Sequence, residues 1–241
     1  MSSDHVVIRW HGQACVTIIS PSGTRLVVDP FDESIGHRLP EAEADVVVTT
    51  HDHYDHANVA GVRGRPKVLS GLTRDARWAA LDQTVGDMRL RTVGTWHDEV
   101  RGAKRGLNSV VIVETGGLRV VHCGDLGHIL TDEQARAIGP VDVLLIPVGG
   151  VYTVGAHEAR AVVRQLAPRR AVIPIHFQTD PLTIHLESVE PFLAGMPGVR
   201  RAEGNELRVP VAPPEGRTPT GQAPAIETVV LAWLAQEHAK E

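Results

Sequence analysis

The sequence predicts a protein of the α/β class, in which strands dominate the first half and alternate with helices in the second. Apolar, β-branched runs separated by turn residues recur through residues 6–122. A succession of strand and helix patterns follows from residue 131 onward. The chain has 241 residues, of which 42% are hydrophobic and 22% charged, so it holds enough apolar material for a large folded domain.

The strands expected in the first half are short. The turn Pro21-Ser22-Gly23-Thr24 divides the earliest of them. Residues 45–50, with three valines and two threonines, have the continuous β-branched character of a strand that is buried on both faces. The full set of expected strands in this half is 6–10, 14–19, 25–28, 45–50, 67–69, 88–93, 109–114 and 118–122.

Helices are expected after residue 130. Thr131 is followed three residues later by Gln134, which is typical of a capping box and predicts a short helix at 132–138. The elements that we expect after it are strand 141–146, helix 156–166, strand 171–175, helix 188–193 and strand 206–209.

The composition changes near the C-terminus. Residues 1–211 are expected to form one domain, and residues 212–225, rich in Pro, Gly and Thr, a linker. Residues 226–241 are expected to form an amphipathic helix, because Val229, Val230, Trp233 and Leu234 have helical spacing. Such a helix would pack on its own domain or on a second subunit of a homo-oligomer.

Charge and cysteine content exclude several classes of protein. With 24 Lys and Arg against 29 Asp and Glu, the net charge is −5, so we expect no nucleic-acid partner. No apolar run approaches the ~18 residues of a membrane span, and no leader pattern precedes the first strand, so we expect a cytoplasmic protein without a membrane partner. Cys15 and Cys123 exclude a disulfide framework and leave a single bridge open.

Histidine is unusually frequent. The chain has 13 His against nine aromatic residues (3 Phe, 4 Trp and 2 Tyr), which indicates imidazoles used for chemistry. Residues 50–56 read Thr-His-Asp-His-Tyr-Asp-His, directly after the buried strand. Side chains two residues apart on an extended chain point the same way, so His51 and His53 can bind one cation. Asp55 and His56, in the following turn, can reach a second.

This segment resembles the H-x-H-x-D-H signature of the metallo-β-lactamase superfamily. Three further motifs of that family follow in order over residues 5–210: His97 after a strand, Asp125 in Gly124-Asp125-Leu126-Gly127, and His176 in Ile175-His176-Phe177. The resemblance implies a four-layer αβ/βα sandwich, with two mixed β-sheets face to face, helices outside and metal ions at one edge.

The resemblance also implies a ligand set. His51, His53 and His97 would hold one metal ion, Asp55, His56 and His176 a second, and Asp125 would lie between the two. Imidazole and carboxylate ligands suit Zn²⁺ most, while Mn²⁺, Fe²⁺ and Co²⁺ also fit. Asp55 and Asp125 would serve catalysis as well, and Asp29 would hold a ligating histidine from behind.

A finer resemblance is to the small stand-alone hydrolases near the ascorbate-6-phosphate lactonases, through Trp10-His11-Gly12-Gln13-Ala14 and Pro147-Val148-Gly149-Gly150. Two positions differ, because Gln13 and His157 stand where relatives often carry His and Asp. The implied activity is hydrolysis of a small ester, lactone, amide or phosphoester by a metal-activated hydroxide. The candidate substrate contacts are His11, Asn108, His128, Tyr152, Thr153 and His157.

Basic residues flank two of the motifs. Arg63 and Arg65 follow the first motif, and Arg101, Lys104 and Arg105 follow His97. If these loops meet at the mouth of the cleft, they would favour an anionic small-molecule substrate. Of the remaining histidines, His122 is expected to be structural, and four are expected at the surface: His5, His37, His185 and His238.

Two other functions fit part of the pattern. A mononuclear iron dioxygenase of the same fold would use only the three-histidine group, and one iron per chain with oxygen consumption would identify it. A metal-binding regulatory protein would retain ligands without turnover. A nucleic-acid processor of the superfamily would carry an additional nuclease domain or arm, for which this length leaves no room.

Overall fold

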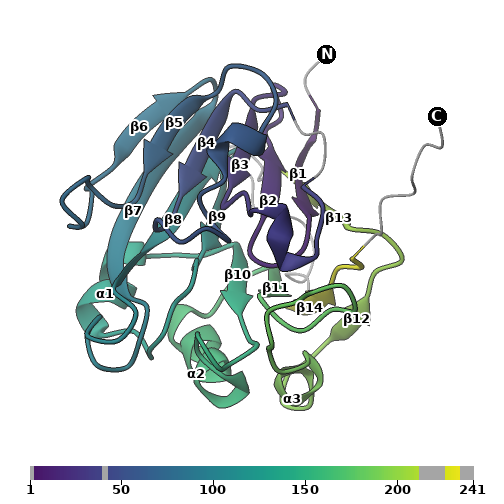
Figure 1. Ribbon diagram of the computed structural model, residues 1–241. Helices are drawn as coiled ribbons and strands as arrows, with labels where there is room; N and C mark the ends of the chain where they lie inside the picture. Colours follow the sequence, from purple (N-terminus) through teal and green to yellow (C-terminus); the bar gives the residue numbers. More distant parts are fainter. Residues whose placement is uncertain (1–2, 40–42, 212–225, 234–241) are drawn as a thin grey trace, which may run out of the picture.

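The computed structural model describes residues 3–39, 43–211 and 226–233. Within these ranges the chain forms two mixed β-sheets packed face to face (Figure 1). The α-helices of the described residues, α1 (Asp132–Ile138), α2 (Ala156–Leu166) and α3 (Glu190–Leu193), lie together on the side of the second sheet. This arrangement confirms the predicted fold class.

The first sheet has six strands. Its antiparallel half contains β13, β1, β2 and β3, and β4 and β5 then run parallel to β3. In spatial order the strands are β13 (Glu206–Pro210), β1 (His5–Trp10), β2 (Val16–Ile19), β3 (Arg25–Val28), β4 (Val46–Thr49) and β5 (Lys67–Ser70).

The second sheet has eight strands. Strands β6 to β9 form an antiparallel meander, and β9, β10, β11, β14 and β12 are parallel. In spatial order they are β12 (Val199–Arg201), β14 (Glu227–Val230), β11 (Ala171–Ile175), β10 (Val143–Pro147), β9 (Leu118–His122), β8 (Leu107–Thr115), β7 (Met88–Trp96) and β6 (Asp82–Val85).

Strand β4 is buried on both faces, as its β-branched run predicts. Val46 and Val48 belong to the main core between the two sheets. Val47 points the other way, into a smaller cluster with Phe31 and Leu182. Among the described residues, the outside of the six-stranded sheet is therefore covered by loops and by the short 3₁₀ turns η1 (Glu33–Ile35) and η2 (Val59–Gly61), not by α-helices.

The internal helices follow their sequence signals closely. Helix α1 has the predicted bounds and a complete capping box between Thr131 and Gln134. Helix α2 also has the predicted bounds. The sequence pattern missed β6 and β12, because both are edge strands whose side chains are largely exposed and carry no apolar alternation.

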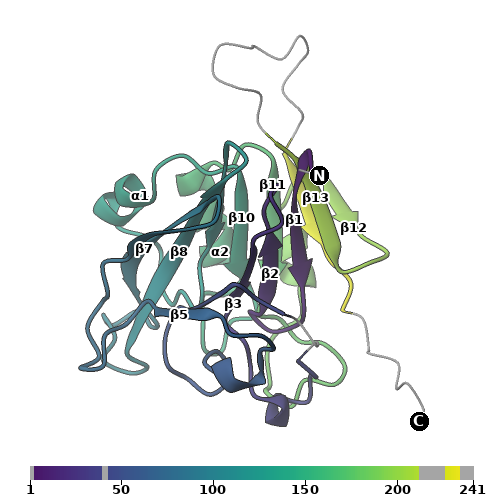
Figure 2. The ribbon, with the colours of Figure 1, turned by 90° about the horizontal axis from the view of Figure 1, so that it is seen from above.

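The helix expected from residue 226 is wrong where the structure describes it. Residues 227–230 form β14, which lies between β11 and β12 (Figure 2). Thr228 and Val229 are fully buried there. Consecutive β-branched residues lose side-chain freedom in a helix, and two parallel neighbours satisfy an extended backbone, so pairing overrides the helical spacing. The expected linker at 212–225 and residues 234–241 lie outside the described residues.

Candidate metal centre

The candidate ligands come from the ends of strands in both sheets. The segment with His51, His53, Asp55 and His56 follows β4 of the first sheet. In the second sheet His97 follows β7, Asp125 lies three residues after β9, and His176 follows β11. Strands β7, β9 and β11 run in the same direction, so their carboxyl ends meet at one edge of the sheet.

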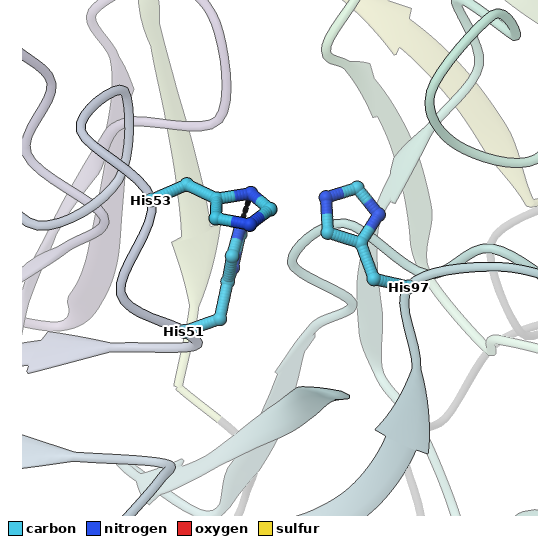
Figure 3. Close-up of side chains that lie close together, drawn as sticks. All are labelled: His51, His53 and His97. Carbon is cyan, nitrogen blue, oxygen red and sulfur yellow. Dashed lines mark hydrogen bonds between the residues drawn. The ribbon is translucent and has the colours of Figure 1, made fainter. Parts of the chain in front are cut away.

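The first group consists of His51, His53 and His97. Figure 3 shows His51 and His53 on one segment and His97 facing them from another. Nε2 of His51 lies 3.1 Å from Nδ1 of His53, and the His97 ring centroid lies 4.9 Å from that of His51. One nitrogen from each ring falls within 4.8 Å of the others, which is the spacing of three ligands around one cation.

The second group consists of Asp55, His56 and His176, whose ligand atoms also lie within 4.8 Å of one another. Asp125 lies between the two groups. Its Oδ2 atom is 3.2 Å from Nε2 of His56, 3.2 Å from Nε2 of His97 and 3.4 Å from Nε2 of His176. One carboxylate oxygen therefore faces imidazoles of both groups.

The donor atoms suit divalent cations. Nε2 of His56 and Oδ1 of Asp125 are buried and make no hydrogen bond within the described protein. Burial opposes the charge on Asp125, but the imidazoles of His176 and His56 hold the pKa of this carboxyl well below its usual range. Burial, assisted by the neighbouring His56, lowers the pKa of His51, whereas the carboxylates of Asp125 and Asp29 raise the pKa of His56 against the effect of burial. An ionised carboxylate and a neutral imidazole are the forms that bind metal.

Asp29 supports both groups from behind. It is fully buried and accepts hydrogen bonds from the Thr50 backbone N–H at 2.7 Å, the Thr50 hydroxyl at 2.7 Å and Nδ1 of His56 at 3.0 Å. The Thr50 oxygen in turn lies 2.9 Å from Nδ1 of His51. Because each Nδ1 proton is thereby engaged, Nε2 of His51 and of His56 is directed at the centre. Asp29, His51 and His56 also lie at ligand spacing, but Asp29 already accepts three hydrogen bonds.

The backbone around the centre is strained. Asp29, His176 and Gln13 have positive φ angles of 52°, 51° and 49°, a region that non-glycine residues seldom adopt. Gly124, with φ of +55°, precedes Asp125, and a Cβ there would lie 2.4 Å from Oδ1 of Asn108. The loop before Asp125 therefore requires glycine.

Two amide side chains position the candidate carboxylates. Nε2 of Gln13 donates to Oδ2 of Asp55 at 2.9 Å, so this departure from the family pattern contacts a candidate ligand. Asn108 is fully buried, and its Oδ1 accepts the backbone N–H of Asp125 at 3.0 Å while its Nδ2 donates to Thr95 and Cys123. Both N–H donors of Asn108 are used inside the protein, and the structure does not bring this candidate substrate contact to the wall of the cavity described below.

A cavity of about 900 Å³ opens onto the centre. Its walls combine candidate ligands with residues of four loops, and the full set is Asp52, His53, Tyr54, Asp55, His97, Arg105, Asp125, Tyr152, His176, Thr183, Ile184 and His185. Among the candidate substrate contacts, Tyr152 lines this cavity. His185, expected at the surface, is exposed on the cavity wall, and the irregular loop around it offers no sequence period that would have predicted this.

Four candidate substrate contacts lie elsewhere. Nε2 of His11 lies 2.8 Å from Oγ1 of Thr17. His128 is held by the backbone of its neighbours, 3.2 Å from Trp96 N and 2.7 Å from Ile129 O. His157 is exposed beside Glu158, and Thr153 donates to a backbone carbonyl. The structure therefore does not bring His11, His128, Thr153 or His157 to the cavity wall.

The remaining buried histidines and the two cysteines have structural roles. His37 is buried, contrary to expectation, and stacks on Trp233 with ring centroids 5.3 Å apart. His122 is buried and bonds to the Ala14 carbonyl at 2.8 Å, as its expected structural role requires. Cys15 and Cys123 are both free and buried, so they form no bridge.

Comparison with known proteins identifies the family. The family model of the beta-lactamase superfamily domain matches residues 7–176, which include all seven candidate ligands. The chain belongs to the metallo-β-lactamase superfamily. A UPF0173 metal-dependent hydrolase from Pyrobaculum arsenaticum is 30% identical over 216 residues, covering 81% of this chain and 94% of that protein. Within the superfamily, this chain is a metal-dependent hydrolase.

Comparison with solved structures supports the same superfamily and fold. A proposed Zn-dependent hydrolase of the metallo-β-lactamase superfamily from Thermotoga maritima matches with a TM-score of 0.71 and 33% identity, covering 94% of this chain and 98% of that one. CmlA, a diiron β-hydroxylase from Streptomyces venezuelae, matches with a TM-score of 0.58 and 17% identity, covering 76% and 46% of the two chains. At that identity the likeness concerns the fold alone.

None of the described helices has the length and apolar character of a membrane span.

Proposed function

We propose that this metallo-β-lactamase superfamily protein is a dinuclear hydrolase of a small ester, lactone, amide or phosphoester. The observation that carries the proposal is the position of Asp125. Its Oδ2 atom lies within 3.4 Å of three imidazole Nε2 atoms that belong to two separate ligand groups. A carboxylate shared in this way is the arrangement that bridges a pair of cations.

His51, His53 and His97 would hold one cation, Asp55, His56 and His176 the other, and Asp125 both. When bound, a pair of divalent ions supplies a water of lowered pKa and polarises the oxygen of the scissile group. Five imidazoles and two carboxylates favour Zn²⁺, with Mn²⁺, Fe²⁺ and Co²⁺ as alternatives.

Asp55 would accept a proton from the attacking water. Its side chain lines the cavity, and Gln13 holds its Oδ2 at 2.9 Å. No described group donates a hydrogen bond to the other oxygen, Oδ1, which can therefore accept a proton from a water molecule. Asp55 would thus combine ligation with general-base catalysis.

The cavity supports a small-molecule substrate. Its volume of about 900 Å³ lies within the range of roughly 300–1,000 Å³ that small-molecule sites occupy. The net charge of −5 argues against a nucleic-acid partner, and we propose a cytoplasmic enzyme.

Metal analysis combined with a substrate panel tests the function. The purified protein is expected to contain two divalent ions per chain and to hydrolyse one member of a panel of lactones, esters, thioesters and phosphodiesters. Asp125→Ala should lose metal-dependent turnover. Asp180→Ala, which removes an exposed carboxylate in the loop after His176, should retain it. Unchanged turnover in Asp125→Ala would overturn the mechanism, and one iron per chain with oxygen consumption would select the dioxygenase.

A further inference from the structure

The loop between β7 and β8 is organised by one buried carboxylate. Asp98 is 1% exposed and accepts four backbone N–H groups, from Val100, Gly102, Lys104 and Arg105, at 2.7–2.9 Å. The loop that begins next to His97 therefore has a defined conformation.

In this conformation the three basic side chains of the loop, Arg101, Lys104 and Arg105, have different surroundings. The Arg101 guanidinium lies over the Trp96 ring, 5.9 Å from its centroid. Lys104 pairs with Glu99. Arg105 alone among the three lines the cavity that contains His97 and Asp125.

Arg105 contacts the loop that contains Val151 and Tyr152, and these contacts leave its charge without a carboxylate partner in the described part of the chain. One of its nitrogens, Nη2, donates to the backbone carbonyl of Val151 at 3.0 Å, and its guanidinium lies 5.6 Å from the centroid of the Tyr152 ring. Among the described residues no carboxylate lies within ion-pair distance of Arg105. Because a guanidinium has five N–H donors and one is used here, donors are left for a ligand in the cavity.

We propose that Arg105 is the specificity-determining residue of this hydrolase and binds a carboxylate or phosphate group of the substrate away from the scissile bond. The inference rests on the proposed function and adds the substrate class, a small anionic ester, lactone, amide or phosphoester. The planar fork of a guanidinium matches both anions bidentately. Tyr152 supports the guanidinium from one side, and the defined loop keeps it at the cavity.

A pair of esters of similar length tests this assignment on the zinc-loaded full chain. Mono-p-nitrophenyl succinate carries a terminal carboxylate, and p-nitrophenyl butyrate ends in a methyl group. Arg105→Gln should reduce kcat/KM for the succinate ester roughly 10- to 100-fold, the loss expected for a hydrogen-bonded charge pair. The kcat/KM for the butyrate ester should change less than about twofold, because this ester has no anionic group for Arg105 to bind.

Two control variants separate recognition from structure. Arg101→Gln removes the same charge from the same loop. Because Arg101 does not line the cavity, this variant should leave the preference for the succinate ester unchanged. Arg105→Lys should restore part of that preference, because a point charge replaces the fork. If Arg105→Gln weakens both esters equally, Arg105 acts only by supporting Tyr152, and the proposal is overturned. Equal kcat/KM values for the two esters in the wild-type protein would also overturn it.

The outcome is independent of whether esters are the correct reaction class. If the zinc-loaded protein hydrolyses neither ester, calorimetric titration with the same two compounds measures binding directly. Tighter binding of the succinate ester that Arg105→Gln abolishes would support the role of Arg105 while counting against ester hydrolysis. Equal binding of the two esters would refute the role of Arg105.

Discussion

Replacing Asp29 by asparagine tests whether one buried carboxylate orients the ligands of both metal groups. Asp29 accepts three hydrogen bonds, two from Thr50 and one from His56. Asparagine has the same shape and tolerates the φ of 52° at this position, but it has only one acceptor oxygen. In either orientation its amide NH₂ faces at least one of these donors, so a buried donor loses its acceptor.

The magnitude follows from the two roles of the carboxylate. Loss of a carboxylate behind a ligating histidine lowers metal affinity about 10- to 100-fold. At about 1.4 kcal/mol per decade, this corresponds to roughly 1.4–2.8 kcal/mol. The unpaired donor should also destabilise the metal-free protein by about 1–3 kcal/mol.

Calorimetric titration of Zn²⁺ into chelator-treated protein measures the affinity, and thermal unfolding of the metal-free protein measures stability. Thr50→Val separates the two groups, because it removes the oxygen that engages Nδ1 of His51 and leaves the bond between Asp29 and His56. Thr50→Val should weaken one of two binding steps, whereas Asp29→Asn should weaken both. A folded Asp29→Asn protein that binds two zinc ions with wild-type affinity would refute the reasoning.

Three further predictions concern the backbone, the pH and the C-terminal strand. Gly124→Ala should lower the free energy of unfolding by several kcal/mol and weaken metal binding in titrations, since the added Cβ would lie 2.4 Å from Asn108. The control Gly23→Ala also changes a glycine of positive φ, but open space surrounds it. This variant should lower the free energy of unfolding by only about 1 kcal/mol. Burial, assisted by Arg9, lowers the pKa of His11 from 6.5 to about 4. The unfolded chain therefore binds the extra proton between these pH values, and stability should fall as the pH drops from 6.5 to 4. Urea unfolding at pH 7 and pH 4.5 measures how much the free energy of unfolding falls between these values. His11→Gln should reduce that fall by up to roughly 3 kcal/mol, and an unchanged fall would contradict the role of His11. Val229→Asp buries a charge within β14 and should unfold the domain by circular dichroism, whereas a helix loosely attached to the surface would tolerate it.

The candidate ligands were predictable because their motifs resemble those of the metallo-β-lactamase superfamily and each motif follows a recognisable strand. Strand patterns such as residues 45–50 and 171–175 depend on local alternation and β-branched content, and the carboxyl ends of strands running in the same direction meet at one edge. The resemblance to the superfamily motifs placed His51, His97 and His176 at one centre before their distances were known. The structure adds that Oδ2 of Asp125 faces both ligand groups.

The substrate contacts were far less predictable. Asn108 was predicted to contact substrate, but its amide group makes hydrogen bonds to Thr95, Cys123 and Asp125 inside the protein. His185, which looked like a surface residue, lines the cavity. The walls come from irregular loops, where no hydrophobic period indicates the direction of a side chain.

The sequence by itself determined the α/β class, the order of the main strands and the residue types of the metal centre, because periodicity, capping and ligand chemistry are local properties of the chain. Only the tertiary structure decided that residues 227–230 form a strand and not a helix, that Gln13 holds Asp55, and that Arg105, not Arg101, reaches the cavity. Each of these depends on partners far away in the chain. A β-strand needs neighbours to satisfy its backbone, and a side chain in a loop takes its direction from the groups packed around it.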